Sequence, residues 1–301
     1  MSFSFDAKNE LCRLPVQKLC CARAEAYGIL LYCNTFSAAE VRIITENPNF
    51  AARLPKLFHR AFNLRFDRQP EPGAAGKMVF QITERRKLER ITDMLGYDPR
   101  QNLVLHINFA LLEEDCCRAS FLRGVFFAGG SITDPLKRYH LELTTSHQQA
   151  SRELEVLLRE SGYPPKSVAR NGSFVTYFKQ SDQIEDFLTL IGAPVAAMNV
   201  MAAKMEKDLR NSVNRRLNCD SANLDKAVLA AQEQLEAIRR LRAAGRLDRL
   251  PEKLKETAAL REAHPELSLS ELAETVDPPV TKSCISHRIE KADGAGERTV
   301  K

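Results

Sequence analysis

Phe121-Leu-Arg-Gly-Val-Phe-Phe-Ala-Gly-Gly-Ser131 carries the strongest structural signal in the chain. Its apolar residues surround Gly124, and a glycine inside an apolar helix marks a place where a second backbone can approach closely. The adjacent pair Cys116-Cys117 precedes this stretch. A second copy lies 96 residues earlier (116 − 20), where Cys20-Cys21 is followed by Gly28 and then by three apolar residues. We therefore expect two related helices in the first two thirds of the chain.

The similarity between the two copies continues downstream in the same order. Strands are expected at 41–45 and 140–145, and again at 78–82 and 174–178, because these segments are rich in β-branched and aromatic residues. Between its two strands each copy has a helix with matching apolar positions, which are Leu54, Leu57 and Phe58 in the first and Leu154, Leu157 and Leu158 in the second. Each copy closes with a helix before Gly96 or Gly192, where glycine suits a left-handed cap.

The repeat predicts an α+β domain with a pseudo-twofold axis, made of halves at about 15–96 and 113–192. Each half reads as helix, strand pair, helix, strand pair, helix. Its first helix is apolar and cannot be buried by that half alone, so packing one helix against its copy closes the domain. Gly28 and Gly124 are expected at this crossing.

The stretch 121–131 resembles the signature helix of LAGLIDADG homing endonucleases, which are built from two αββαββα halves. The resemblance implies that an acidic residue at the end of each signature helix binds divalent metal ions for phosphodiester cleavage. Those acid positions fall on Cys33 and Gly129, and an earlier acidic position falls on Leu31 and Phe127. None of these side chains is a carboxylate, the ligand that Mg²⁺ requires. We therefore expect no catalytic residue and no metal at this place.

In that family the open sheet face contacts DNA. Here alternation along 140–145 is expected to expose His140, Glu142 and Thr144, and the basic candidates in the first half are Arg42 and Lys77. This is little positive charge for phosphate binding. We interpret the face as solvated surface.

The bulk composition leaves the class of partner open. The chain has 301 residues and a formal net charge of +5, from 44 basic and 39 acidic side chains. That charge permits an anionic partner such as nucleic acid without requiring one. There is no apolar run long enough to span a membrane and no secretory signal pattern, which indicates a cytoplasmic protein.

The eight cysteines are interpreted as small apolar side chains in a reducing cytosol. No CxxC spacing occurs, and the two adjacent pairs are not expected to share one metal ion easily. Neither a metal nor another cofactor is predicted.

Helical sequence dominates the last third of the chain. A basic linker at 204–222 is followed by a long amphipathic helix that ends at Gly245, with apolar positions at Leu224, Val228, Ala231, Leu235, Ile238 and Leu241. A further helix opens at Pro251 and stops at His264-Pro265. Ser268-Leu-Ser-Glu271 has the pattern of a capping box and starts a short helix.

The last two helices predict a helix-turn-helix at about 268–291. Asp277-Pro278-Pro279 breaks the chain, and 280–289 follows as a helix that mixes basic and small polar residues with apolar ones. The second helix of this motif lies in the major groove of DNA. The predicted DNA-binding residues are Lys282, Ser283, Ser286, His287 and Arg288.

Together these elements resemble the WhiA family of bacterial regulators over nearly the whole chain. The resemblance rests on 121–124 with 128–131, 139–142, 211–218, 267–272, and 278–283 with His287-Arg288. It implies binding to promoter DNA through the helix-turn-helix, and a role in cell division, chromosome segregation or sporulation. One departure is that Glu290 and Gly294-Ala-Gly296 follow the His-Arg pair. We therefore expect the recognition helix to end early and DNA affinity to be modest.

The expected organisation is a degenerate endonuclease-like domain at 1–203, the linker at 204–222 and an all-α helix-turn-helix domain at 223–301. The expected function is a non-catalytic, nucleoid-associated, monomeric regulator that binds double-stranded DNA, with other regulatory proteins as further partners and no membrane contact. Two alternatives stay open. One is a protein-binding adaptor in division or chromosome organisation. The other is an active homing endonuclease, which Cys33 and Gly129 disfavour.

Overall fold

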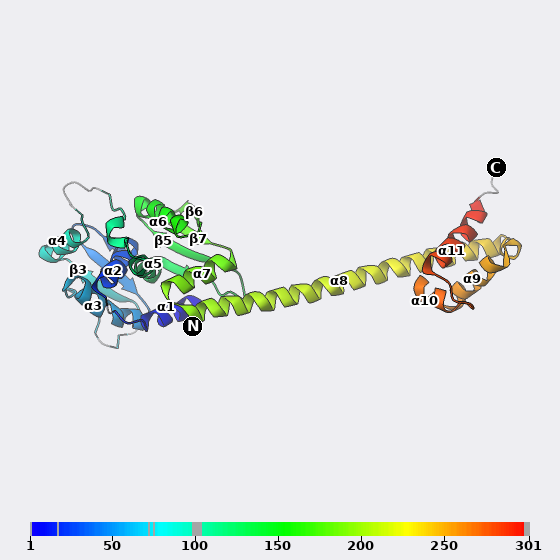
Figure 1. Ribbon diagram of the computed structural model, residues 1–301, viewed down its shortest axis with the longest axis horizontal. Coiled ribbons are helices and arrows are strands. Elements are labelled where there is room, and N and C mark those ends of the chain that lie inside the picture. The colour runs from blue at the N-terminus through cyan, green and yellow to red at the C-terminus, as the bar shows by residue number, and fades with distance from the viewer. Residues whose placement is uncertain (1, 17, 72, 75, 98–103, 298–301) are drawn as a thin grey trace. The chain divides into compact units, whose positions relative to one another are not determined.

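The computed structural model describes residues 2–16, 18–71, 73–74, 76–97 and 104–297 (Figure 1). The chain divides into two units, Met1–Asp208 and Leu209–Lys301. Helix α8 (Pro194–Ala243) contributes its first residues to the first unit and the remainder to the second. Among the helices of these ranges, none is both long and apolar enough to cross a membrane.

The first half of the first unit combines helices with a three-stranded antiparallel sheet of order β1-β2-β3. In chain order its elements are α1 (Phe3–Cys12), α2 (Leu19–Tyr32), β1 (Thr35–Phe36), β2 (Val41–Thr45), α3 (Pro48–Phe62), β3 (Met78–Ile82) and α4 (Arg85–Met94). Along β2, Val41 and Ile43 are buried and Arg42 is exposed, so one sheet face lies on the core.

The second half has the same order with a four-stranded antiparallel sheet, β4-β5-β7-β6. A 3₁₀ turn η1 (Phe109–Leu112) leads into α5 (Asp115–Gly129), β4 (Gly130–Ile132), β5 (Leu141–Thr145), α6 (Gln148–Glu160), β6 (Lys166–Arg170), β7 (Ser173–Phe178) and α7 (Ser181–Ile191). The pseudo-symmetric α+β architecture is thereby confirmed.

The two halves differ in one strand. We predicted two strand pairs in each half, and this prediction is wrong for the first half. There an isolated bridge between Arg68 and Gln81 is found in place of a strand before β3. Pro70 lies two residues after Arg68, and Gly73 and Gly76 both have positive φ. Proline cannot donate to a ladder and glycine weakens a strand, which explains why the described residues of this segment form no strand.

Helices α2 and α5 lie side by side at the centre of the first unit (Figure 1). A Cβ atom on Gly28 would lie 2.2 Å from the carbonyl oxygen of Phe121, and one on Gly124 would lie 2.0 Å from that of Glu25. Both contacts are to backbone, so only glycine permits this approach. The predicted crossing is confirmed.

The other repeated features are also confirmed. The apolar positions predicted in α3 and α6 are buried. Gly96 and Gly192 follow α4 and α7 with φ of +74° and +95°, the left-handed conformation that glycine adopts without steric cost.

The second unit is helical. After the end of α8 it contains a 3₁₀ turn η2 (Leu247–Arg249), α9 (Glu252–Ala263), α10 (Leu269–Glu274) and α11 (Lys282–Glu297). The expectation that the last helix ends early is wrong, because α11 continues through both glycines to Glu297. A helix glycine costs only about 1 kcal/mol relative to alanine, and no proline interrupts the segment.

The long amphipathic helix is buried over only part of its predicted length. Ala231, Ile238 and Leu241 are buried, whereas Leu224 and Val228 are 65% and 47% exposed. The apolar stripe therefore packs in its second part and faces solvent in its first.

Candidate nucleic-acid interface

The last two helices are held together by a small apolar core. Leu272 and Ala273 of α10 pack against Ile285 and Ile289 of α11. The predicted capping box is present, since Ser268 Oγ accepts from the Glu271 backbone N–H and a Glu271 carboxylate oxygen accepts from that of Ser268. A short helix that is capped and buried in this way can fix the start of the next one.

Arg261, at the end of α9, anchors the connection to α10. Its side chain is buried, with Nε donating to the side-chain oxygen of Gln234 at 3.0 Å and Nη1 donating to the Leu267 carbonyl at 2.6 Å. Burial lowers the pKa of this guanidinium. Sequence reasoning missed this residue, because nothing in a charged helix shows which arginine will turn inward.

The connection to α11 ends on a cap that the sequence reasoning also missed. Thr281 Oγ1 accepts from the Cys284 backbone N–H at 3.3 Å, so Thr281 lies before the first turn of α11. Threonine is a favoured N-cap residue, and this was the available signal.

Three of the five predicted DNA-binding residues share one side of α11. Residues on a helix advance by about 100° each, so Ser283, Ser286 and His287 project away from the stripe that Ile285 and Ile289 bury, whereas Lys282 lies at the edge of that stripe, at the first position of the helix. Lys282, Ser283 and His287 are exposed and Ser286 is half-buried. Arg288 is half-buried and lies beyond the opposite edge of the stripe.

An acidic residue belongs to the same side of α11. Glu290 accepts a hydrogen bond of 3.0 Å from Ser286 Oγ, one turn earlier. The carboxylate orients this hydroxyl and reduces the positive charge of the surface. The first two turns of α11 therefore suit contact with base edges better than a dense set of phosphate contacts.

The two positions at which the sequence resemblance places nuclease acids, Cys33 and Gly129, contain no carboxylate. Cys33 ends α2, is buried, and its thiol donates to the carbonyls of Leu30 and Thr35 at 3.2 and 3.1 Å. Burial raises the pKa of this thiol to about 12. At neutral pH it is a protonated group that is already hydrogen-bonded.

Gly129, at the end of α5, has no room for a side chain. A Cβ atom there would lie 2.3 Å from the Thr144 carbonyl oxygen and 2.7 Å from the Tyr32 ring. Two residues earlier, the ring of Phe127 stacks on that of Phe50 with centroids 4.7 Å apart. Apolar packing occupies the end of both helices.

One buried carboxylate does lie on a signature helix, but it is fully paired. Glu25 accepts from Arg53 Nε at 2.6 Å and Nη2 at 2.9 Å, and from Arg123 Nη1 at 3.1 Å. Arg123 comes from α5 and Arg53 from α3. This ion cluster joins the two halves and leaves no oxygen directed at a metal.

The open face of the second sheet carries more basic residues than alternation on one strand suggested. Register places Lys166, Tyr177 and Glu142 in one cross-strand row, with Lys179 Nζ 5.2 Å from the centre of the Tyr177 ring. A Glu142 carboxylate oxygen lies within hydrogen-bonding distance of His140 Nε2. The missed signal was Asn171-Gly172, with φ of 48° and 76°, because such a pair joins two strands in a hairpin.

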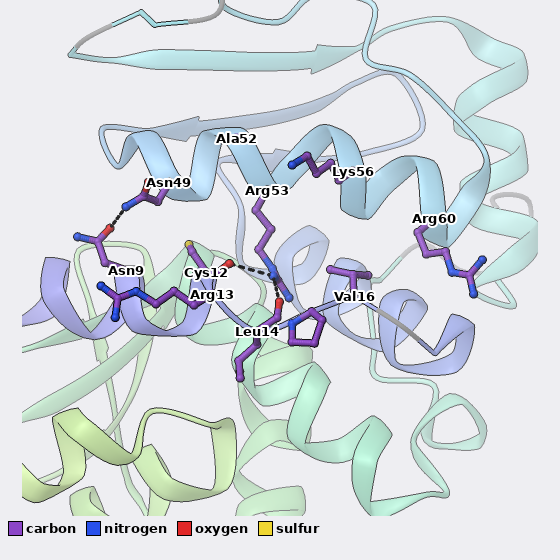
Figure 2. A pocket seen from close by; sticks show the side chains of 11 residues that line it. Asn9, Cys12, Arg13, Leu14, Val16, Asn49, Ala52, Arg53, Lys56 and Arg60 are labelled. Atoms are coloured by element: carbon purple, nitrogen blue, oxygen red, sulfur yellow. Dashed lines mark hydrogen bonds between the residues drawn. The ribbon is translucent and has the colours of Figure 1, made fainter.

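Figure 2 shows a pocket of about 550 Å³ between α1 and α3. Arg13, Lys56 and Arg60 give it a basic wall, and Arg53 lies in it with Nη1 donating to the Leu14 carbonyl at 2.5 Å. Its lining residues include no carboxylate. The pocket can contact an anion but has no acid–base pair for catalysis.

Four thiols come together where α2 and α5 begin. The Sγ atoms of Cys20, Cys21, Cys116 and Cys117 all lie within 4.8 Å of one another. The expectation that the two adjacent pairs would not easily share one metal ion is therefore wrong as far as distance is concerned. The pseudo-twofold relation of the halves places the two pairs next to each other.

Comparison with known proteins gives a consistent result for both units. A family model described as the WhiA LAGLIDADG-like domain matches residues 118–210, and one described as the WhiA C-terminal HTH domain matches residues 213–294. The second match includes α10 and the predicted DNA-binding residues of α11.

Full-length relatives also match. A "Probable cell division protein WhiA" from Ruminiclostridium cellulolyticum is 36% identical over 306 residues, covering 99% of this chain and 98% of the relative. One from Alkaliphilus metalliredigens is 33% identical over 311 residues, with coverages of 99% and 98%. The crystal structure of full-length DUF199/WhiA from Thermatoga maritima matches with a TM-score of 0.59 at 22% identity and covers 99% of both chains, which supports the fold.

Proposed function

The chain belongs to the WhiA family, and from that premise we propose that it is a DNA-binding regulator that acts through α10 and α11. The observation that carries the proposal is the start of α11, where Lys282, Ser283 and His287 are exposed on a helix fixed by its own core. The relatives' names point to a role in cell division. A chain of this kind would associate with the nucleoid.

The contribution of α11 can be measured with the full chain and a duplex enriched from a random library by that chain. We expect Lys282→Ala with Arg288→Ala to weaken binding. A lost base-edge contact costs about 1–3 kcal/mol of binding free energy and relaxes sequence specificity. A lost phosphate contact reduces the slope of log affinity against log salt concentration by about one and weakens binding to all DNA sequences equally. Affinity measured at several salt concentrations separates the two roles.

The control removes the same charge elsewhere in the second unit. Lys226→Ala with Lys253→Ala alters exposed lysines on α8 and α9 and should leave affinity almost unchanged. Equal losses in both double variants would show that α11 has no special part, and an intact affinity of the α11 variant would place the interface elsewhere.

We further propose that the protein does not cleave DNA. The support is the pair of positions at Cys33 and Gly129, where one side chain is a hydrogen-bonded thiol and the other cannot exist without displacing Tyr32. Supercoiled plasmid and the enriched duplex should both stay intact with Mg²⁺ or Mn²⁺. Site-specific cleavage that disappears on substitution near Cys33 and Gly129 would refute this.

A protein-binding adaptor is the second candidate, favoured by exposed apolar residues on α8. Leu209, Val213 and Leu217 are 69%, 49% and 60% exposed and are spaced by four residues, so they form one stripe. Leu209→Lys with Leu217→Lys should keep DNA affinity. Failure of that variant to complement a strain that lacks the gene would support the adaptor role, and full complementation would contradict it.

A further inference from the structure

The four-thiol cluster, Cys20, Cys21, Cys116 and Cys117, has no part in the function proposed above. Each half supplies one adjacent pair, from the first turn of α2 and from the first turn of α5. The pairs are equivalent positions of the repeat, so the pseudo-twofold axis passes between them. Two segments that are almost a hundred residues apart in the sequence thus bring four sulfur atoms within 4.8 Å of one another.

The spacing of the sulfur atoms fits a single tetrahedral metal ion. Zinc–thiolate bonds of about 2.3 Å place tetrahedral sulfurs about 3.8 Å apart. The Sγ atoms of Cys20 and Cys21 are 4.0 Å apart, and all four lie within 4.8 Å of one another. Four thiolates in a tetrahedron select zinc or an iron–sulfur centre. A cluster with several irons and bridging sulfides needs a wider set of ligands, so the spacing favours one zinc ion.

The surrounding backbone suits the charge of such a centre. Zn²⁺ with four thiolates carries a net charge of −2. Helices α2 and α5 both begin here, and the side chains of their N-cap residues, Lys18 and Glu114, make no capping hydrogen bond. The four cysteines lie in the first turns of both helices, so the positive ends of two helix dipoles lie at the cluster and favour its negative charge.

The cluster is also accessible on one side. Cys117 is buried and Cys20 is exposed, with Cys21 and Cys116 between these limits. A metal ion can enter from the side of Cys20 and be held by the deeper thiols. An entry path of this kind is one of the requirements of a metal site.

We propose that the four-thiol cluster binds one Zn²⁺ ion, which ties the first turns of α2 and α5 together. The four thiols lose their protons to solvent as four zinc–sulfur bonds form, with no change of oxidation state. The site is structural, because all four ligands come from the protein. It links the halves at a point separate from the glycine crossing.

The test uses the full chain, reduced and stripped of metal with a chelator. Zn²⁺ is titrated in competition with a chromophoric chelator, and Co²⁺ is titrated separately as a spectroscopic probe. We expect one equivalent of either metal per chain. Bound Co²⁺ should show thiolate-to-metal charge transfer and the strong visible bands of a tetrahedral site, and Zn²⁺ should raise the melting temperature.

Three variants assign the ligands. Cys20→Ser changes an exposed residue and should not disturb folding, whereas Cys117→Ser changes the buried one. Each should weaken zinc binding by at least about 10–100-fold, the loss typical of substitutions one step further from a metal. Cys219→Ser, at an exposed cysteine of α8, is the matched control and should bind as the parent does.

Three results would overturn the proposal. The first is that the parent chain takes up neither metal. The second is that Cys20→Ser leaves zinc affinity unchanged in a folded protein. The third is that disulfides form between α2 and α5 in the zinc-treated chain under reducing conditions.

Discussion

At the residue scale, Gly124 controls how closely the two halves approach. Gly124→Leu would place side-chain atoms where the backbone of α2 lies, because a Cβ alone would be 2.0 Å from the Glu25 oxygen. Overpacking of this kind costs about 1–3 kcal/mol, and more where backbone must move. Thermal unfolding should show a large loss of stability. Ala52→Leu, at an exposed position of α3, is the control, and a parent-like melting temperature for both variants would argue against the crossing.

Glu25 is the second residue with a large expected effect. Glu25→Gln keeps the shape of the side chain but leaves two guanidinium groups without a counter-ion in the core. Breaking a buried ion pair costs on the order of 3–5 kcal/mol. The control Glu89→Gln breaks an exposed pair with Arg85, and because solvent screens this pair the control should lose much less stability. Urea unfolding compares the two, and equal losses would contradict the buried cluster.

At the scale of elements, α10 depends on its cap because it is short. Ser268→Ala removes the oxygen that accepts from the Glu271 N–H, and loss of such a cap costs about 0.5–2 kcal/mol. Hydrogen exchange should become faster in α10 and at the start of α11. Ser270→Ala, an exposed position inside the same helix, should leave exchange unchanged or slower. The same exchange in both variants would mean that the apolar core alone holds α10.

Some of these elements could be predicted from the sequence and others could not. The repeat, the closing glycines and the capping box were predictable, because each is a local rule that restricts the residue at a known spacing. The missing strand before β3 had a visible cause in Pro70. The four-thiol cluster and the Glu25 ion cluster were not predictable, because they depend on how helices from different halves meet. Periodicity places Leu224 on the apolar stripe of α8 but does not show whether another helix covers that part of the stripe.

At the scale of the molecule, we expect a mutation in one unit to affect the property of that unit and to leave the property of the other unit unchanged. We propose DNA contact for α11 in the second unit, whereas the glycine crossing lies in the first. Gly124→Leu should therefore lower the stability of the first unit and leave DNA affinity close to that of the parent at a temperature where both units are folded. Anisotropy titration measures this. A parallel fall in affinity would show that the first unit takes part in binding.

The packing at Gly129 opposes any acidic side chain at the end of α5. Replacing Gly129 with aspartate would add a carboxylate, but its first carbon would collide with the backbone of β5 and the ring of Tyr32. A carboxylate at this position would need the Tyr32 ring and the β5 backbone to move together, so a single substitution at Gly129 cannot add one without a loss of stability.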